Sequence, residues 1–404
     1  MKNISLNNIS KVLFILAYTF LSIHFFMDKV TFLEPYIPYF KYLGILLLSF
    51  IFAYSFIVSS WKVKLITLFI NVVGLISYLV SKDIHFLIFC LCITSMKDIK
   101  FESIIRYDLC LKVVILMLLM IFYYLDMVTF VSLIRNGLER VSFGFSHPNT
   151  FAFCFAIVIL EIFYVFRYRR DKFHFLILGA SCFFLNYFSG SRGSVILLFT
   201  FLIFTLLSYL KFLRRLLNTK VLRFIIQNIL TIFAIISVVL IIQYRASNES
   251  IVNLDKMVSG RIRLASTYFD NYSINLFGNN IPVIGTDEAR TTNAKLLVID
   301  NTYIYFLLRF GIVSYLIFSS SFFFGIWTSF KKSDKTYIII ITSLVIYGLV
   351  ETYTYKIPFN TFILLVGDVI YEDRNKKSIK VNKNNVKLKG DINERKIKKN
   401  YKYY

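Results

Sequence analysis

The sequence predicts an all-α fold, a polytopic bundle of about twelve transmembrane helices. Of its 404 residues, 57% are hydrophobic and only 17% are charged, and the mean hydropathy is +0.66. A soluble domain of this length could not bury so much apolar surface in one core. Apolar runs of roughly twenty residues recur, each long enough to cross the hydrocarbon core of a membrane as a helix. The runs are too long and too uniformly apolar for barrel strands, so helices are favoured.

The individual spans can be placed between charged or polar breaks in the sequence. Each break carries Lys, Arg, Asp, Asn or Gly, whereas the stretch between two breaks is almost wholly apolar. The fourth and the last stretches are short for a membrane crossing. The predicted spans lie near residues 11-27, 42-60, 65-81, 84-96, 109-126, 148-166, 173-188, 194-210, 224-243, 303-328, 336-352 and 358-371.

The positive charges predict how these spans are oriented. The formal net charge is 46 − 23 = +23, and Lys and Arg gather in alternate connections and after the last span. Basic connections are typically retained in the cytoplasm, so both termini are predicted to lie there. Because the charges are divided among short loops, the pattern argues against a nucleic-acid partner. The predicted outer connections are 28-41, 82-83, 127-147, 189-193, 244-302 and 353-357.

Two segments differ in composition from the spans. Residues 244-302 mix polar residues with apolar ones at helix-like spacing, which predicts a small folded cap on the outer surface. Residues 372-404 contain 12 Lys or Arg against 4 acids, which predicts a basic disordered cytoplasmic tail attracted to anionic lipid. The predicted organisation is therefore a transmembrane domain over 1-371, including the cap, followed by the tail.

Four short polar patches fall in the predicted outer connections. The first is RVSFGFSHPN at 140-149, and the second is SGSRGS at 189-194. The third begins at 260-263 with GRIR, and the fourth is DNTY at 300-303. The orientation is predicted from charge alone, so finding all four patches on one side indicates a shared outer site.

The arginines of these patches are suited to bind a diphosphate. A guanidinium holds phosphate through a flat, bidentate pair of N–H groups. Glycines in the second patch allow backbone amides to approach an anion at a helix start, where the dipole favours negative charge. Each arginine could instead be an interfacial side chain, and the turn could simply require glycine. The candidate ligands are Arg140, Arg192, Arg261 and Arg263, together with Ser191, Gly190 and Gly193.

Asp300 is the candidate general base, because its carboxylate can take a proton from an attacking hydroxyl. Glu351, near the outer end of its predicted span, is the reserve candidate. His147 could serve the same purpose or donate a hydrogen bond to a sugar. Both motifs also have structural alternatives, since His147-Pro148-Asn149 can begin a helix and Asp300-Asn301 can cap one.

The remaining polar residues predict no metal or cofactor site. His24, His85 and His174 are scattered over span ends on both faces. The five cysteines lie in or beside apolar runs and contain no C-x-x-C pair, so they are predicted to be small core residues. Glu161 lies inside the sixth span, where an acid is either functional or paired with a neighbouring helix.

At the four patches the chain resembles the bacterial O-antigen polymerase and O-antigen ligase group, which joins polyprenyl-diphosphate-linked glycans outside the cytoplasmic membrane. With the order of spans and the late outer loop, the resemblance covers most of residues 100-330. It implies a membrane-embedded, GT-C-like glycosyltransferase that requires no metal or cofactor. The matching residues are His147-Pro148-Asn149, Ser191-Arg192-Gly193, Gly260-Arg261 with Gly278, and Asp300-Asn301 with Tyr303 and Gly311.

The resemblance also implies roles for single residues. Ligase members typically carry a histidine before the asparagine of the fourth motif, whereas this chain has Asp300 there, which favours a polymerase. We expect Arg192 and Arg261 to contact the donor diphosphate and Asp300 to act as the base. The expected substrate-binding residues are Arg140, His147, Asn149, Ser191, Arg263, Asn301, Tyr303 and Glu351.

The predicted function is polymerisation of lipid-linked oligosaccharide repeat units into O-antigen, capsule or exopolysaccharide. Besides membrane lipid, the expected partners are the polyprenyl-diphosphate-linked oligosaccharide, a chain-length regulator and a flippase. A ligase that transfers a finished glycan is the alternative within the same class. A lipid-linked oligosaccharide flippase or secondary transporter is the alternative from another class. A pure scaffold would leave the arginines unexplained.

Overall fold

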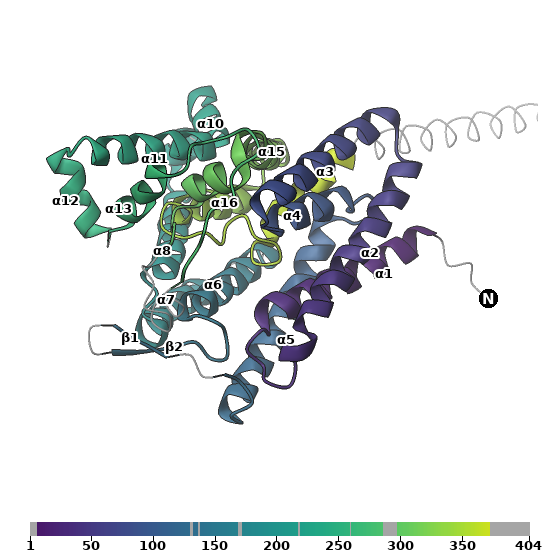
Figure 1. Cartoon of the computed structure of the whole chain (residues 1–404), viewed down its shortest axis with the longest axis horizontal. Helices are drawn as coiled ribbons and strands as arrows, with labels where there is room; N and C mark the ends of the chain where they lie inside the picture. The colour runs from purple at the N-terminus through teal and green to yellow at the C-terminus, as the bar shows by residue number, and fades with distance from the viewer. Residues whose placement is uncertain are drawn as a thin grey trace, which may run out of the picture.

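The computed structural model describes residues 6–129, 132–135, 138–168, 172–216, 219–258, 260–285 and 297–371. Within these ranges, helices dominate and one short hairpin joins β1 (Ser132–Arg135) to β2 (Leu138–Val141) in antiparallel register (Figure 1). The helices are α1 (Leu6–Phe26), η1 (Glu34–Tyr36), α2 (Ile37–Val58), α3 (Trp61–Ser81), α4 (His85–Thr94), α5 (Phe101–Tyr124), α6 (Pro148–Val165), α7 (Lys172–Phe184), η2 (Leu185–Ser189), α8 (Arg192–Leu207), α9 (Lys211–Leu216), α10 (Lys220–Gln227), α11 (Ile229–Arg245), α12 (Glu249–Met257), α13 (Arg261–Ser266), η3 (Thr267–Asp270), α15 (Thr302–Lys332), α16 (Lys335–Tyr347) and η4 (Thr361–Leu364), which continues as a helix to Tyr371.

Each apolar segment that the sequence predicts is helical over most of its length. In the described part of the chain, five helices are long and apolar enough to cross a membrane. A sixth crossing is possible if α10 and α11, which are bent by 62°, count as one span. The chain therefore has the helices of an all-α membrane protein. The count of about twelve spans stays a prediction, because the other apolar helices are shorter.

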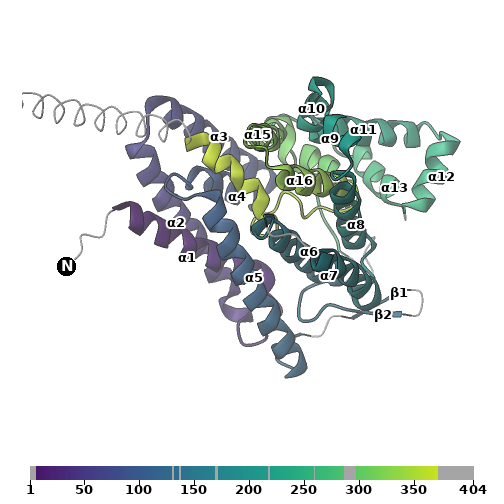
Figure 2. The ribbon, with the colours of Figure 1, turned by 180° about the vertical axis from the view of Figure 1, so that it is seen from behind.

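α15 and α16 occupy the middle of the molecule in both views (Figures 1 and 2). The first five helices lie on one side of this pair. α11, α12 and α13 lie on the other side, and α12 forms the far edge of the molecule. The segment predicted as an outer cap is thus attached to the bundle next to the central helices.

The starts of three helices, α6, α8 and α15, lie close together at one end of the bundle. Asn149 in the first turn of α6 donates a hydrogen bond to Glu351, which follows α16. Gly193 in the first turn of α8 packs on the same glutamate, because a Cβ there would lie 3.1 Å from its Cγ. At the start of α15, the hydroxyl of Thr302 donates to the backbone carbonyl of Glu351 at 2.6 Å. The 348–360 connection therefore joins α6, α8 and α15 at the end predicted to face outward.

The opposite end is held by an ionic cluster. Arg167, just after α6, donates to Glu102 at 2.5 Å, and its Nε lies 3.6 Å from Asp334. The hydroxyl of Tyr164 contacts both acids at 3.1 Å. These contacts tie α5, α6 and α16 together at the end predicted to be cytoplasmic.

α15 is interrupted at Gly311, where the outer loop inserts into the helix. Gly311 has φ 85° and ψ 175°, a conformation that breaks the helical hydrogen bonds and favours glycine. Residues 275–279 supply the missing partners, so the buried backbone groups at the break are paired. The contact is backbone against backbone, since a Cβ on Gly278 would collide with the carbonyl of Arg309. The bonds run from Ile312 N–H to Asn275 C=O, from Val313 N–H to Leu276 C=O and from Asn279 N–H to Arg309 C=O.

The outer loop before this insertion is itself helical, as its apolar spacing predicts. α13 follows α12 closely in the chain, and η3 comes directly after α13. Asp255 near the end of α12 is buried, and its Oδ1 accepts the backbone N–H groups of Ile262 and Arg263 at 2.9 and 3.1 Å. One acidic side chain thus caps the start of α13 and fixes its direction. The predicted tail, 372-404, lies outside the described residues.

One predicted boundary is wrong. The span predicted over 336-352 ends at Tyr347, so Glu351 lies in a connection and not in a helix. The outer connection predicted over 127-147 contains a β-hairpin that the sequence did not predict. Strands of four residues are too short for a period of two to stand out in the sequence.

We expect Gly278→Ala to reduce stability by about 3 kcal/mol or more, because the new Cβ would collide with the backbone of α15 at a φ of +88°. Thermal unfolding of the purified protein in detergent measures the effect. Gly285→Ala is the matched control, since no atom of the described residues lies within 4 Å of a Cβ there. Equal melting temperatures for the two variants would show that the insertion does not stabilise the fold.

Candidate functional site

Glu351 is the centre of the candidate site. Its Oε1 accepts a hydrogen bond from the side-chain amide of Asn149 at 3.0 Å and another from Nη2 of Arg261 at 3.3 Å. The glutamate is 5% exposed, so it interacts mainly with protein groups. The first and third polar patches of the sequence therefore meet on one buried carboxylate, which the sequence ranks only as a reserve candidate.

Arg140, on β2, holds the side chain of Asn149 in position through a hydrogen bond. Its Nη2 donates to Oδ1 of Asn149 at 2.5 Å, and its Nε donates to the carbonyl of Ser189 at 2.6 Å. Gly190 has a positive φ of 55°, and a Cβ on it would lie 3.2 Å from the Arg140 Nε. Glycine in the second patch therefore makes room for a guanidinium. Ser191 is buried beside it and donates to the hydroxyl of Ser194 at 3.3 Å.

Arg261 lies between two carboxylates. It is the first residue of α13, following Gly260 with φ +76°. Besides its bond to Glu351, its Nε lies 3.8 Å from Oδ2 of Asp300. Its Nη1 is buried and has no hydrogen-bond partner among the described residues. An unpaired N–H of a charged group is costly when buried, so this atom is available to a ligand oxygen.

The two carboxyl groups beside Arg261, those of Glu351 and Asp300, both have raised pKa values. Burial, together with the nearby charge of Asp300, raises the pKa of Glu351 to about 7 against the opposing effect of Arg261. Burial also raises the pKa of Asp300, again against the effect of Arg261. Two acids therefore compete for one guanidinium and can hold a proton near neutral pH, which is the range that suits a general base.

Three predicted site residues have structural contacts. His147 is the N-cap of α6, and its Nδ1 accepts the backbone N–H of Asn149 at 3.0 Å. Asn301 is the N-cap of α15, and its Oδ1 accepts the N–H groups of Tyr303 and Ile304 at 3.0 and 3.1 Å. Tyr303 is 1% exposed, and its hydroxyl donates to the carbonyl of Val345. The capping alternatives are thus confirmed for the first and fourth patches, and Tyr303 belongs to the core.

Arg192 and Arg263 are the two exposed arginines of the predicted set. Arg192 begins α8, while Arg263 is the third residue of α13 and approaches Gly260 with its guanidinium. The described contacts therefore connect Arg140 and Arg261 to Glu351, and they leave Arg192 and Arg263 facing outward from the protein.

A second ionic cluster near the site was missed by the sequence analysis. Oδ1 of Asp83 contacts Nδ1 of His85 at 2.7 Å, while Oδ2 accepts from the hydroxyl of Tyr305 at 2.9 Å and lies 3.6 Å from Nε of Arg309. Although burial opposes it, His85 holds the pKa of Asp83 well below its ordinary value, with help from Lys356. The available signal in the sequence was an acid in a two-residue connection, Asp83, with a histidine, His85, two residues later.

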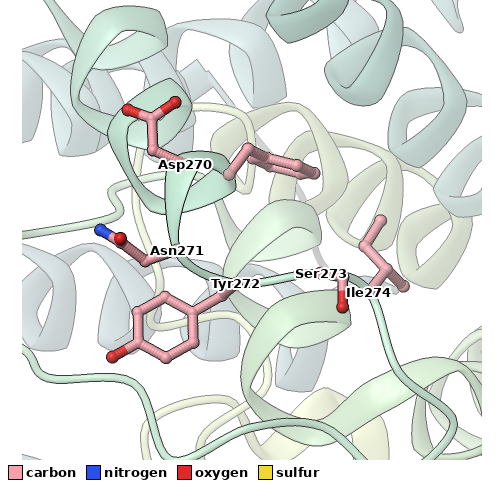
Figure 3. Close-up of a pocket in the computed structure, with 6 residues that line it drawn as sticks. Asp270, Asn271, Tyr272, Ser273 and Ile274 are labelled. Carbon is pink, nitrogen blue, oxygen red and sulfur yellow. The ribbon is translucent and has the colours of Figure 1, made fainter.

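An open hollow of about 470 Å³ lies along the outer loop and is lined by residues 269–274 (Figure 3). Its side chains come from one continuous stretch of chain. Asp270 in this stretch is exposed and pairs with Arg245 at 3.0 Å. The hollow contains none of the predicted site residues, so it is separate from the cluster around Glu351.

Comparison with known proteins gives no direct assignment. No family model, no curated protein and no solved structure matches the chain. Among the described residues, no group of three or more His, Cys, Asp or Glu could hold a metal ion. The chemistry of the site must therefore be inferred from its own contacts.

The raised pKa of Glu351 predicts that stability depends on pH. The folded protein holds this proton more tightly than the unfolded chain, so the stabilisation is fully present below about pH 4.5 and is lost as pH rises through about 7. The change should amount to at most about 3 kcal/mol. We expect Glu351→Gln, which keeps an acceptor oxygen, to remove this dependence in melting curves recorded from about pH 5 to 8.

Asp270→Asn is the control for this measurement, because it removes an exposed carboxylate from the outer loop. It should leave the pH dependence unchanged. If Glu351→Gln and the wild type lose stability equally over the same pH range, another group is responsible.

Proposed function

We propose that the chain is a membrane glycosyltransferase, a polysaccharide polymerase that joins polyprenyl-diphosphate-linked oligosaccharides on the outer face of the cytoplasmic membrane. The observation that carries the proposal is the unpaired, buried Nη1 of Arg261 beside the Asp300–Glu351 acid pair. An anion-binding donor and a titrating carboxyl next to each other are the two groups that metal-free glycosyl transfer requires. The proposal includes about twelve spans in a GT-C-like arrangement, with both termini cytoplasmic.

In this proposal the arginines bind the donor diphosphate. Arg261 supplies the pre-positioned N–H, and the exposed Arg192 and Arg263 add positive charge around it. Negative charge develops on the diphosphate as its bond to the anomeric carbon breaks, and fixed guanidinium groups stabilise that charge. Arg140 acts indirectly, since its bonds to Ser189 and Asn149 hold the position of the amide that contacts Glu351.

Asp300 is the proposed proton acceptor. Its side chain is 34% exposed, whereas that of Glu351 is only 6% exposed, so Asp300 is the acid that a sugar hydroxyl can reach. The hydroxyl oxygen of the acceptor bonds to the anomeric carbon, the bond from that carbon to the diphosphate breaks, and the hydroxyl proton passes to Asp300. Glu351 is then a positioning residue for Arg261 and Asn149.

The experiment is an extension assay with purified protein in lipid nanodiscs and a polyprenyl-diphosphate-linked oligosaccharide as both donor and acceptor. We expect a ladder of products, each one repeat unit longer than the last. Arg261→Ala and Asp300→Asn should each reduce the rate by about 100-fold or more. Arg192→Ala should reduce it less, because an exposed charge is screened by solvent.

Arg245→Ala is the control, since it removes an exposed arginine of the same loop whose partner is Asp270. It should retain the wild-type rate. Transfer of one glycan to a different acceptor, without a ladder, would identify a ligase instead. Unchanged ladders from all three site variants, prepared as stable protein, would overturn the assignment of these residues.

A flippase or transporter is the second candidate, and the interrupted helices favour it. α15 is broken at Gly311, and α10 meets α11 at a 62° bend. Broken helices often surround the substrate site of transporters. In sealed proteoliposomes the two functions separate clearly: movement of the lipid-linked oligosaccharide across the bilayer without lengthening would identify a carrier.

A further inference from the structure

Three ionisable side chains are completely buried between α5 and α6, away from the candidate site. Nζ of Lys112 lies 2.5 Å from Oδ2 of Asp108 and 2.7 Å from Oε1 of Glu161, and all three side chains have zero exposure. Asp108 and Lys112 are one helical turn apart on α5, while Glu161 comes from α6. Glu161 is the acid that the sequence identified inside a span, and its pairing with a neighbouring helix is confirmed.

The triad is surrounded by neutral partners. The hydroxyl of Thr361, at the start of η4, contacts both Lys112 and Asp108. The hydroxyl of Tyr18 on α1 lies 2.8 Å from that of Thr361. Cys154 on α6 is the remaining titratable group that interacts with Lys112 and is also fully buried. These elements supply no second cation among the described groups that interact with the triad.

The charges of the triad do not balance if all three groups are ionised. Two carboxylates and one ammonium leave a net charge of −1 inside the helix bundle. A buried ion without a partner is penalised by several kcal/mol, and a buried acid in this position takes up a proton instead. One proton on either acid makes the whole cluster neutral.

The carboxylate oxygens also indicate a bound proton. Among the described residues, Oδ1 of Asp108 and Oε2 of Glu161 are buried without a hydrogen-bond partner. Ionised carboxylates only accept hydrogen bonds, so two buried acids in one cluster with unmatched oxygens are unfavourable when both are ionised. A hydroxyl on one carboxyl group would replace one unmatched acceptor with a donor.

We propose that the Asp108–Lys112–Glu161 triad is a proton-binding site in the interior of the helix bundle and that Glu161 carries the proton. Asp108 is the better anion, because its Oδ2 accepts from both Lys112 and Thr361, whereas Oε1 of Glu161 accepts from Lys112 alone. The site is independent of the proposed transferase. Glu161 lies 12 residues beyond Asn149 on α6, or about 18 Å along the helix axis.

Infrared spectroscopy tests this protonation directly. Wild-type protein at about pH 8.5, above the pKa of about 7 for Glu351, should show the carbonyl stretching band of a buried carboxylic acid. Glu161→Gln should lose that band and should melt within about 3 °C of the wild type, because a neutral amide replaces a neutral acid. Glu249→Gln, on an exposed acid of α12, should keep the band.

The double substitution Asp108→Asn with Glu161→Gln should destabilise the protein, unlike Glu161→Gln alone. It removes every anion near Lys112 and should lower the melting temperature well below that of Glu161→Gln alone. Three outcomes would overturn the proposal: no such band in the wild type, an unfolded Glu161→Gln variant, or a double variant as stable as the single one. These spectral and thermal measurements do not depend on glycosyl transfer. Their outcome therefore tests the triad alone, and the extension assay tests the proposed function alone.

Discussion

The carboxylate of Glu351 is the interaction on which the arrangement of the candidate site depends. It receives one hydrogen bond from the start of α6 and one from the start of α13, and its backbone carbonyl receives another from the start of α15. These helices are far apart in sequence, and none of them would place Arg261 at this point by itself. Since the carboxylate is buried, removing it would leave these two side-chain donors without their acceptor.

The outer loop reaches this carboxylate because it is anchored at both ends. Asp255 fixes the start of α13, and the insertion of residues 275–279 at Gly311 fixes the chain that follows. Between these anchors, Arg261 has little freedom to move away from Asp300. Pre-positioning of this kind reduces the entropy that is lost when a guanidinium binds a diphosphate.

The sequence predicted the helices well, because their signal is local. Apolar runs mark the helices of the predicted spans, and the His147-Pro148 and Asn301 motifs mark two helix starts within three residues. Contacts between distant segments could not be predicted in this way. The pairing of Gly278 with Gly311 depends on how the loop returns to α15, and the position of Glu351 depends on where α16 ends.

The same limit explains what the sequence left open about the charged residues. Asp108 and Lys112 have the spacing of an ion pair on one helical face, yet that spacing also occurs on helices exposed to water. Only the packing of α5 against α6 shows that Glu161 joins them. Among the arginines, the sequence grouped Arg192 with Arg261 as diphosphate ligands, whereas burial separates Arg140 and Arg261 from Arg192 and Arg263.

The interior triad and the Glu351 site differ in how their charge can change. In the triad, loss of the proton would leave a net negative charge among side chains with zero exposure, so the neutral form is strongly favoured. At the Glu351 site, Arg261 and Asp300 are partly exposed, and an anion from outside can replace a carboxylate as the partner of the guanidinium. Protonation of Glu351 would then release Arg261 for a diphosphate, so proton uptake and donor binding at this end of the bundle should favour each other.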